Sequence, residues 1–268
     1  MTGTGESMTT RDALRAHGQA MRARLFPLPS DDPTPPNGLT PPGAGAPGYD
    51  AMITEAVFGG VWTRAGLGIA DRMICTLAAL ASVQRLRHLR AFAGAALEVG
   101  LTPRAIQEIC IQIGIYAGMP ASEEALDAAG QVFAERGILV GQAMPPPASL
   151  EALSAMGEAV MRALHGERAA GGYAAPDNKV TSALYPIAIQ WGYGEIWHRP
   201  GLERRERALV AVAAFTALKL GQVQKFGESA LNVGLSKTEV IEAIVQTGPY
   251  SGFAPALNAL GALSDVLR

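Results

Sequence analysis

Residues Gly194 to Leu202 read GEIWHRPGL, and Arg207 follows five residues later. An upstream stretch from Gly59 to Leu67 reads GGVWTRAGL and is followed at the same distance by Arg72. The pattern Trp-x-Arg-x-Gly-Leu therefore occurs twice with the same internal spacing. Such an internal repeat is the first feature to establish, because it determines how the rest of the chain is interpreted.

Both copies are followed by similar sequence. Each copy leads into an apolar segment, then a short segment ending in Val-Gly-Leu, then a Glu-x3-Gln-x3-Tyr-x-Gly pattern that starts at Glu108 and again at Glu242. The apolar residues recur at helical spacing, and no segment alternates as a strand does. The sequence predicts an all-α fold of two homologous helical-bundle repeats, in residues 1–145 and 146–268.

The expected helices are bounded by ordinary start and stop signals. Thr102-Pro103 and Ser236 are typical of helix N-termini, and Gly100 and Gly234 of C-termini. The remaining helices are expected at 10–25, 49–58, 71–82, 84–99, 122–136, 150–164, 184–193, 204–218, 222–232 and 254–267. Residues 27–47 are rich in Pro and Gly, which favours a long loop. We interpret it as a connector or, alternatively, a lid.

Composition excludes several classes of protein. Of the 268 residues, 49% are hydrophobic and 17% charged, which is typical of a globular chain with a sizeable core. A net charge of -2 argues against nucleic-acid binding. We expect no membrane span, no metal site and a cytoplasmic location. The two cysteines, Cys75 and Cys110, form no CxxC motif, and they align with aliphatic residues of the second repeat.

The repeated motifs resemble those of the carboxymuconolactone decarboxylase family, within the alkylhydroperoxidase-like superfamily. The family pattern is Trp-Gly-Glu-Val-Trp-x-Arg-Pro-Gly-Leu, then an Arg that opens an apolar helix, and later Tyr-Ala-Gly-x-Pro. The second repeat matches best, from Gly194 through Arg207 to Tyr250, while the first has Gly60 in place of the motif Glu. The resemblance covers roughly residues 50–137 and 150–268.

The resemblance implies a cofactor-independent reaction on a small enolisable lactone or carbonyl compound, with decarboxylation of a carboxymuconolactone-like acid as the first expectation. Loss of CO2 leaves a dienolate, which needs an oxyanion stabiliser and an acid that protonates carbon. It also needs an anion clamp, a role suited to arginine. The expected catalytic residues are Glu195, His88, Arg207 and Arg72. The expected substrate-binding residues are Arg199, Arg64, Trp197, Trp62, Arg85, Lys219, Phe92 and Phe226.

The chain departs from the family pattern at one informative position. In the family, the short helix carries a histidine six residues before an Asn-Asn-Gly, and here Phe92 and Phe226 take that position. His88 lies one helical turn before Phe92 and is a displaced acid or base candidate. The peroxidase branch places a CxxC where this chain has Arg85 and His88, and Lys219 and Gln222, so thiol peroxidase chemistry is not expected.

Each assignment has a structural alternative. The arginines could form internal ion pairs, Glu195 could pair with Arg199, Lys219 could lie along an apolar surface, and the tryptophans could belong to the core. Two other functions remain open: a cyclase or isomerase of a biosynthetic pathway, which needs little acid–base machinery, and a non-catalytic binding or assembly protein. The resemblance also implies a homo-oligomer, with a trimer of tandem-repeat chains favoured because one chain resembles a fused dimer.

Overall fold

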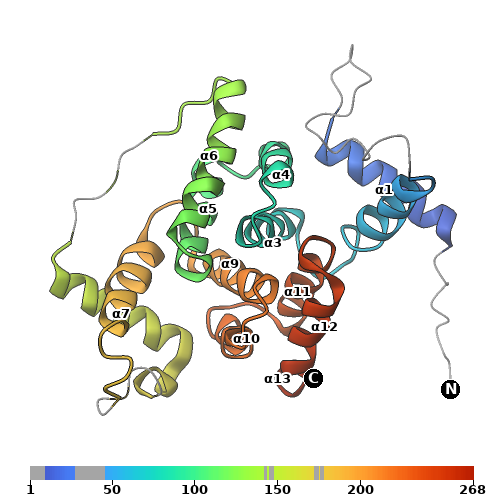
Figure 1. Cartoon of the computed structure of the whole chain (residues 1–268). Coiled ribbons are helices and arrows are strands. Elements are labelled where there is room, and N and C mark those ends of the chain that lie inside the picture. Colours follow the sequence, from blue (N-terminus) through green and yellow to red (C-terminus); the bar gives the residue numbers. More distant parts are fainter. Residues whose placement is uncertain (1–9, 28–45, 142–143, 145–147, 172–174, 176–177) are drawn as a thin grey trace. The chain divides into compact units, whose positions relative to one another are not determined.

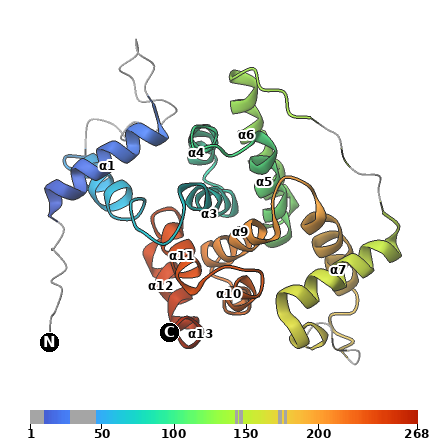
Figure 2. The ribbon, with the colours of Figure 1, turned by 180° about the vertical axis from the view of Figure 1, so that it is seen from behind.

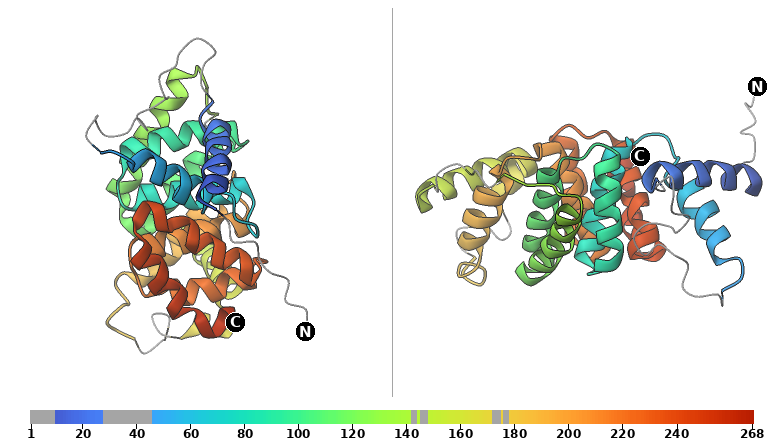
Figure 3. Two further views of the ribbon diagram at one scale, coloured as in Figure 1. Left: turned by 90° about the vertical axis from the view of Figure 1, so that its right-hand side faces the viewer. Right: turned by 90° about the horizontal axis from the view of Figure 1, so that it is seen from above.

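A computed structural model describes residues 10–27, 46–141, 144, 148–171, 175 and 178–268. The described residues form helices and connecting segments, without a strand, as every view shows (Figures 2 and 3). The all-α prediction is confirmed. The chain divides into two compact units, Met1–Ala65 and Gly66–Arg268. This division does not follow the repeat boundary near residue 145, so the two-repeat domain division stays a prediction.

The first unit contains α1 (Arg11–Leu25), α2 (Tyr49–Ile53) and the π-helix η2 (Thr54–Gly59). Helix α1 begins where the Thr10 hydroxyl accepts a hydrogen bond from the Ala13 amide at 3.2 Å, an N-cap. Its arginines Arg11 and Arg15 bind the buried carboxylate of Glu55 on η2. The predicted Pro/Gly-rich loop falls almost entirely outside the described residues.

The second unit holds the remaining elements (Figure 1). They are α3 (Ile69–Ser82), α4 (Leu86–Glu98), α5 (Pro103–Ala117), α6 (Met119–Glu135), α7 (Leu150–His165), η3 (Gly166–Ala170), α8 (Tyr185–Ile187), η5 (Ala188–Glu195), η6 (Ile196–His198), α9 (Arg204–Ala217), α10 (Gln222–Asn232), α11 (Lys237–Ser251), α12 (Phe253–Ala262) and α13 (Ser264–Leu267).

The centre of this unit is the contact between α3 and α9, which lie side by side in both Figure 1 and Figure 2. Both helices are apolar on nearly every side, so both are buried along most of their length. Helix α5 packs on α3 and α9, and so does α11. Helices α3 and α5 belong to the first repeat and α9 and α11 to the second, so the two repeats share one core.

Each repeat also contains one close helix crossing of the same kind, which the sequence motif does not reveal. On α7, a Cβ atom at Gly157 would lie 2.3 Å from the Ile189 carbonyl oxygen of η5. In the first unit, a Cβ atom at Gly18 of α1 would lie 2.0 Å from the Thr54 carbonyl oxygen of η2. Only glycine permits backbones to approach this closely. Helix α7 is therefore the counterpart of α1, and η5 the counterpart of η2.

Two predicted helix starts are wrong. The helix expected from residue 84 begins at Leu86, because Gln84 adopts a left-handed conformation with φ of 55°. The helix expected from Ser122 begins earlier, at Met119, and Ser122 is buried inside it. Pro120 in the first turn explains this start, since proline lacks the amide hydrogen that the first turn leaves unbonded.

Candidate active site

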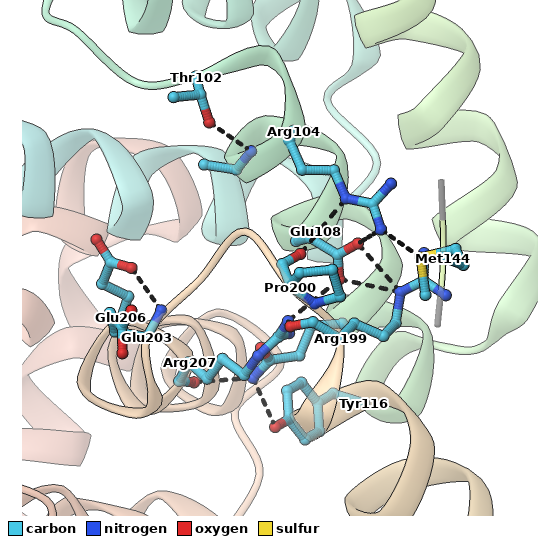
Figure 4. Close-up of polar contacts among 12 residues, drawn as sticks. Thr102, Arg104, Glu108, Tyr116, Met144, Arg199, Pro200, Glu203, Glu206 and Arg207 are labelled. Atoms are coloured by element: carbon cyan, nitrogen blue, oxygen red, sulfur yellow. Dashed lines mark hydrogen bonds and ion pairs between the residues drawn. The ribbon is translucent and has the colours of Figure 1, made fainter. Parts of the chain in front are cut away.

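The buried carboxylate of Glu108, on α5, meets three guanidinium groups (Figure 4). Arg104 Nη2 lies 2.9 Å from Oε1, Arg199 Nε lies 3.0 Å from Oε2, and Arg207 Nη2 lies 3.2 Å from Oε2. These four side chains carry three positive charges and one negative charge. We call Arg104, Glu108, Arg199 and Arg207, with Gln112 and Tyr116, the Glu108 cluster.

The members of the Glu108 cluster differ in their exposure to solvent. The side chains of Glu108 and Arg207 are 0% exposed, whereas those of Arg104 and Arg199 are 22% and 19% exposed. Arg104 Nη2 also lies 2.7 Å from the Met144 Sδ atom. A dissolved anion could therefore reach Arg104 and Arg199, while Arg207 serves as an internal counter-ion.

Arg207 is held by both repeats. Its Nη1 donates to Gln112 Oε1 at 3.1 Å, and its Nη2 donates to the Arg199 carbonyl oxygen at 2.6 Å. Burial lowers the pKa of the Arg207 guanidinium, and the neighbouring Glu108 carboxylate opposes that shift. Arg207 comes from α9 and Gln112 from α5, so this contact joins the second repeat to the first.

Beside the contact between Arg207 and Gln112, hydrogen-bond donors outnumber acceptors. Gln112 Nε2 donates to the Arg207 carbonyl oxygen at 2.8 Å and to the Tyr116 hydroxyl at 3.2 Å. Burial raises the pKa of Tyr116, so its hydroxyl keeps its proton at neutral pH. Trp197 Nε1 and Arg207 Nε are buried without an acceptor among the described residues. The Trp197 N–H does lie near enough to the Tyr116 hydroxyl to oppose the rise in that pKa, although the pair lacks hydrogen-bond geometry.

The internal repeat places a second cluster, around Glu242, in correspondence with the Glu108 cluster. Arg72 on α3 donates from Nη2 to Glu242 Oε2 at 2.8 Å and from Nη1 to Gln246 Oε1 at 3.1 Å, both on α11. Each repeat thus supplies the arginine for the Glu-x3-Gln pair of the other. The sequence motifs contained these residues, but they did not show that the arginine of each repeat binds the glutamate of the other.

The two clusters differ at one position that sequence reasoning missed. A Cβ atom at Gly201 would contact Arg104 and Glu108, and a Cβ atom at Gly66 would contact Thr238 and Glu242. Arg104 and Thr238 are therefore equivalent, four residues before each glutamate. At this position the Glu108 cluster has Arg104, and the cluster around Glu242 has the uncharged Thr238. The Glu108 cluster therefore carries one more positive charge here.

The predicted acids take part in none of these contacts. Glu195, at the end of η5, is partly exposed and has no polar side-chain contact among the described residues, so the alternative pairing with Arg199 is wrong. His88 lies on the exposed surface of α4, where desolvation by neighbouring side chains, together with the charges of Arg87 and Arg85, lowers its pKa. Arg85, the N-cap residue of α4, is also exposed.

The two phenylalanines at the family's histidine position are core residues. Phe92 packs edge-on against Tyr250 with ring centroids 5.3 Å apart, and Phe226 packs against Tyr116 at 6.4 Å. These pairs again join opposite repeats. In the first unit, Trp62 is buried and Arg64 is exposed.

The sequence alignment of the two helix turns needs a correction. Arg85 and Lys219 were expected to be equivalent. The backbone amide of Arg85 bonds the Leu80 carbonyl oxygen, as that of Leu220 bonds the Phe215 carbonyl oxygen. Leu220 is thus the counterpart of Arg85, and Lys219 is the counterpart of Gln84. From this turn to the phenylalanine, the second repeat is one residue shorter than the first, with seven positions from Lys219 to Phe226 and eight from Gln84 to Phe92, which shifted the alignment.

Sequence reasoning also missed His165, at the end of α7. Its Nδ1 lies 2.6 Å from the Ser229 hydroxyl, and its ring lies edge-on to Phe226 at 5.2 Å. The Ser229 hydroxyl donates its proton to the Lys225 carbonyl oxygen at 2.8 Å, so His165 Nδ1 must carry the proton in their contact. Burial, together with Lys225 and Arg168, lowers the pKa of His165 to about 4. The only sequence signal was the absence of a histidine at Phe226, which does not point to another helix.

Both cysteine thiols are buried, and burial raises the pKa of each, that of Cys110 to about 12. A thiol in this environment has little of the reactive thiolate form. Among the described residues, no three His, Cys, Asp or Glu side chains are grouped so that they could hold a metal ion. Within the same part of the chain, no helix has the length and apolar character needed to cross a membrane.

Comparison with known proteins identifies related sequences. The profile of the carboxymuconolactone decarboxylase family matches residues 47–131 and 184–265. A 4-carboxymuconolactone decarboxylase of Acinetobacter baylyi is 33% identical over 90 residues, which are 34% of this chain and 67% of that protein. A nitrosuccinic acid decarboxylase of Metarhizium robertsii is 28% identical over 75 residues, 28% of this chain and 52% of that protein. An uncharacterized 15.0 kDa protein of Paracoccus denitrificans is 34% identical over 91 residues, 33% of this chain and 68% of that protein.

Proposed function

Because the chain belongs to the carboxymuconolactone decarboxylase family, we propose that it is a carboxy-lyase for a small acid that carries a second anionic group. Two of the relatives are named as decarboxylases, one for 4-carboxymuconolactone and one for nitrosuccinic acid. The observation that carries the proposal is the Glu108 cluster, where three guanidinium groups face one carboxylate.

The net charge of the Glu108 cluster favours an anionic ligand. Arg207 is neutralised by Glu108 inside the protein, and the charges of Arg104 and Arg199 remain in excess. Both of these side chains are partly exposed. Guanidinium groups bind carboxylates with short, directional hydrogen bonds, so we assign Arg104 and Arg199 as the clamp for a substrate carboxylate.

The same charge would assist the reaction. In decarboxylation, the bond between the carboxylate carbon and its neighbour breaks, CO2 leaves, and the electron pair passes to an oxygen of the conjugated acceptor group, which is the lactone carbonyl in 4-carboxymuconolactone and the nitro group in nitrosuccinic acid. Fixed positive charge beside this oxygen stabilises the enolate that forms. Tyr116, which keeps its proton, is suited to donate a hydrogen bond to it. The reaction ends when an acid delivers a proton to carbon, and Glu195 is our candidate for that proton transfer.

A second candidate function is isomerisation or cyclisation on the same fold. The buried aromatic contacts of Phe92 and Phe226 favour it, because these residues replace the family's histidine in both repeats. A reaction without loss of CO2 makes smaller demands on acid–base groups.

The test is to incubate the purified full chain with 4-carboxymuconolactone and, separately, with nitrosuccinic acid, and to measure CO2 and remaining substrate. We expect CO2 in equal amount to the acid consumed, at a turnover of about 1 s⁻¹ or more for the better substrate. The Acinetobacter relative serves as a positive control for the lactone. Consumption of an acid without CO2 would favour isomerisation, and no reaction with either acid would contradict the proposal.

A further inference from the structure

A separate pocket lies between α9, α10 and α12 of the second repeat. Its volume is about 160 Å³, and none of its lining residues belongs to the Glu108 cluster. Its lining residues are mostly apolar, and the polar ones are Thr216, Lys219 and Asn258. The lining includes Phe215, Lys219, Leu220, Val223, Pro255 and Asn258.

At the equivalent position in the first repeat, a side chain bridges two helices by hydrogen bonds. Gln84 and Lys219 are the two non-glycine residues with positive φ among the described residues, at 55° and 60°. Gln84 Nε2 donates to the Ala81 carbonyl oxygen at 2.7 Å and to the Ala121 carbonyl oxygen at 3.0 Å. The Gln84 side chain thereby ties the end of α3 to α6.

Lys219 has the same backbone conformation, but its side chain makes no corresponding hydrogen bonds among the described residues. Pro255 is the counterpart of Ala121, since a Cβ atom at Gly114 would contact Met119 and Ser122 as one at Gly248 would contact Phe253 and Ala256. Lys219 is exposed, and its ammonium group has no partner among the described residues. An exposed lysine without an ionic partner among the described residues therefore belongs to the lining of a mostly apolar pocket.

Beside Lys219, the second repeat also lacks the carboxylate that the first repeat has at the corresponding position. Asn258 lines the pocket where the first repeat has Glu124, by the same correspondence of α12 with α6. The substitution removes a negative charge that would neutralise Lys219. Lys219 is thus the one charged side chain among the described lining residues, and the Asn258 amide can donate a hydrogen bond to an anion.

From these observations we propose that this pocket binds a small organic monoanion. The apolar body of the ligand packs against Phe215, Leu220 and Val223, and its carboxylate meets Lys219 and Asn258. The volume is close to the ~150 Å³ of an engineered cavity that binds benzene, so one six-membered ring is the appropriate size. No lining residue of this pocket belongs to the Glu108 cluster, so benzoate binding here and CO2 release can be tested separately.

The test is calorimetric titration of the full chain with benzoate, with benzamide as the neutral probe of equal shape. We expect one benzoate site per chain, with benzoate bound at least about tenfold more tightly than benzamide. Equal affinity for the two probes, or no benzoate binding at millimolar concentration, would overturn the proposal.

Exchange variants locate the site. Lys219→Gln is expected to weaken benzoate binding at least about tenfold, because it removes the cation and introduces the residue found at this position in the first repeat. Gln84→Lys is expected to create no second site, because Glu124 would neutralise the added lysine. The matched control is Lys225→Gln, which removes a lysine of α10 that does not line the pocket. Unchanged affinity in folded Lys219→Gln, or an equal loss in Lys225→Gln, would show that benzoate binds elsewhere.

Discussion

Replacing Glu108 with Gln should lower the free energy of unfolding by about 3–5 kcal/mol, the range found when one partner of a buried ion pair is removed. The substitution leaves Arg207, which is 0% exposed, without a negative partner. It also places an amide N–H₂ group where three guanidinium groups need acceptors. The measurement is urea denaturation of the full chain, evaluated by linear extrapolation.

The control for this prediction is Glu135→Gln. Glu135 also pairs with an arginine, Arg90, but both side chains are substantially exposed. Exposed ion pairs contribute about 0–1 kcal/mol, so this variant should retain nearly the full stability. A loss below about 1 kcal/mol in Glu108→Gln, comparable with the control, would contradict the assignment of Glu108 as the counter-ion that holds the two repeats together.

The second large effect is expected on acidification. The pKa of His165 is lowered from 6.5 to about 4 in the folded protein, so the unfolded chain binds a proton between these pH values and the folded protein does not. Stability from neutral His165 is complete above pH 6.5 and is lost as the pH falls toward 4. Since each unit of pKa corresponds to about 1.4 kcal/mol, the loss is about 3 kcal/mol.

The free energy of unfolding should therefore be measured at several pH values between 7 and 4 for the native chain and for His165→Gln. The glutamine can still donate to Ser229 but does not titrate, so the variant should show a shallower decrease. His198→Gln, which removes an exposed histidine on η6, is the matched control and should keep the native slope. Equal slopes in the native chain and in His165→Gln would show that His165 is not the group that titrates.

Local sequence predicted most of the helices. The capping residues Thr10, Thr102 and Ser236 each accept the hydrogen bond expected of an N-cap. The helix from Gln222 to Asn232 has the predicted bounds. Such features depend on residues within one or two turns of each other. The misplaced starts arose where the backbone conformation of one residue decided the outcome, as at Gln84.

The site was harder to predict, because its contacts join residues far apart in the chain. Arg207 and Glu108 were both visible in repeated motifs, but periodicity within one repeat cannot show that each arginine binds the glutamate of the other. Arg104 was not predicted as a site residue, because only comparison with its counterpart Thr238 shows that it adds a positive charge to one repeat. His165 comes from a helix without a motif, and only packing brings it to Phe226.

The excess positive charge of the Glu108 cluster is expected to bind a carboxylate of the substrate. The most direct test is kcat/KM for CO2 release, measured for the native chain and for Arg104→Thr, which introduces the residue of the other repeat. We expect kcat/KM to fall about 10- to 100-fold, the equivalent of one hydrogen-bonded charge contact, while the melting temperature stays close to the native value. A kcat/KM within about twofold of the native value, with CO2 still released, would contradict the claim.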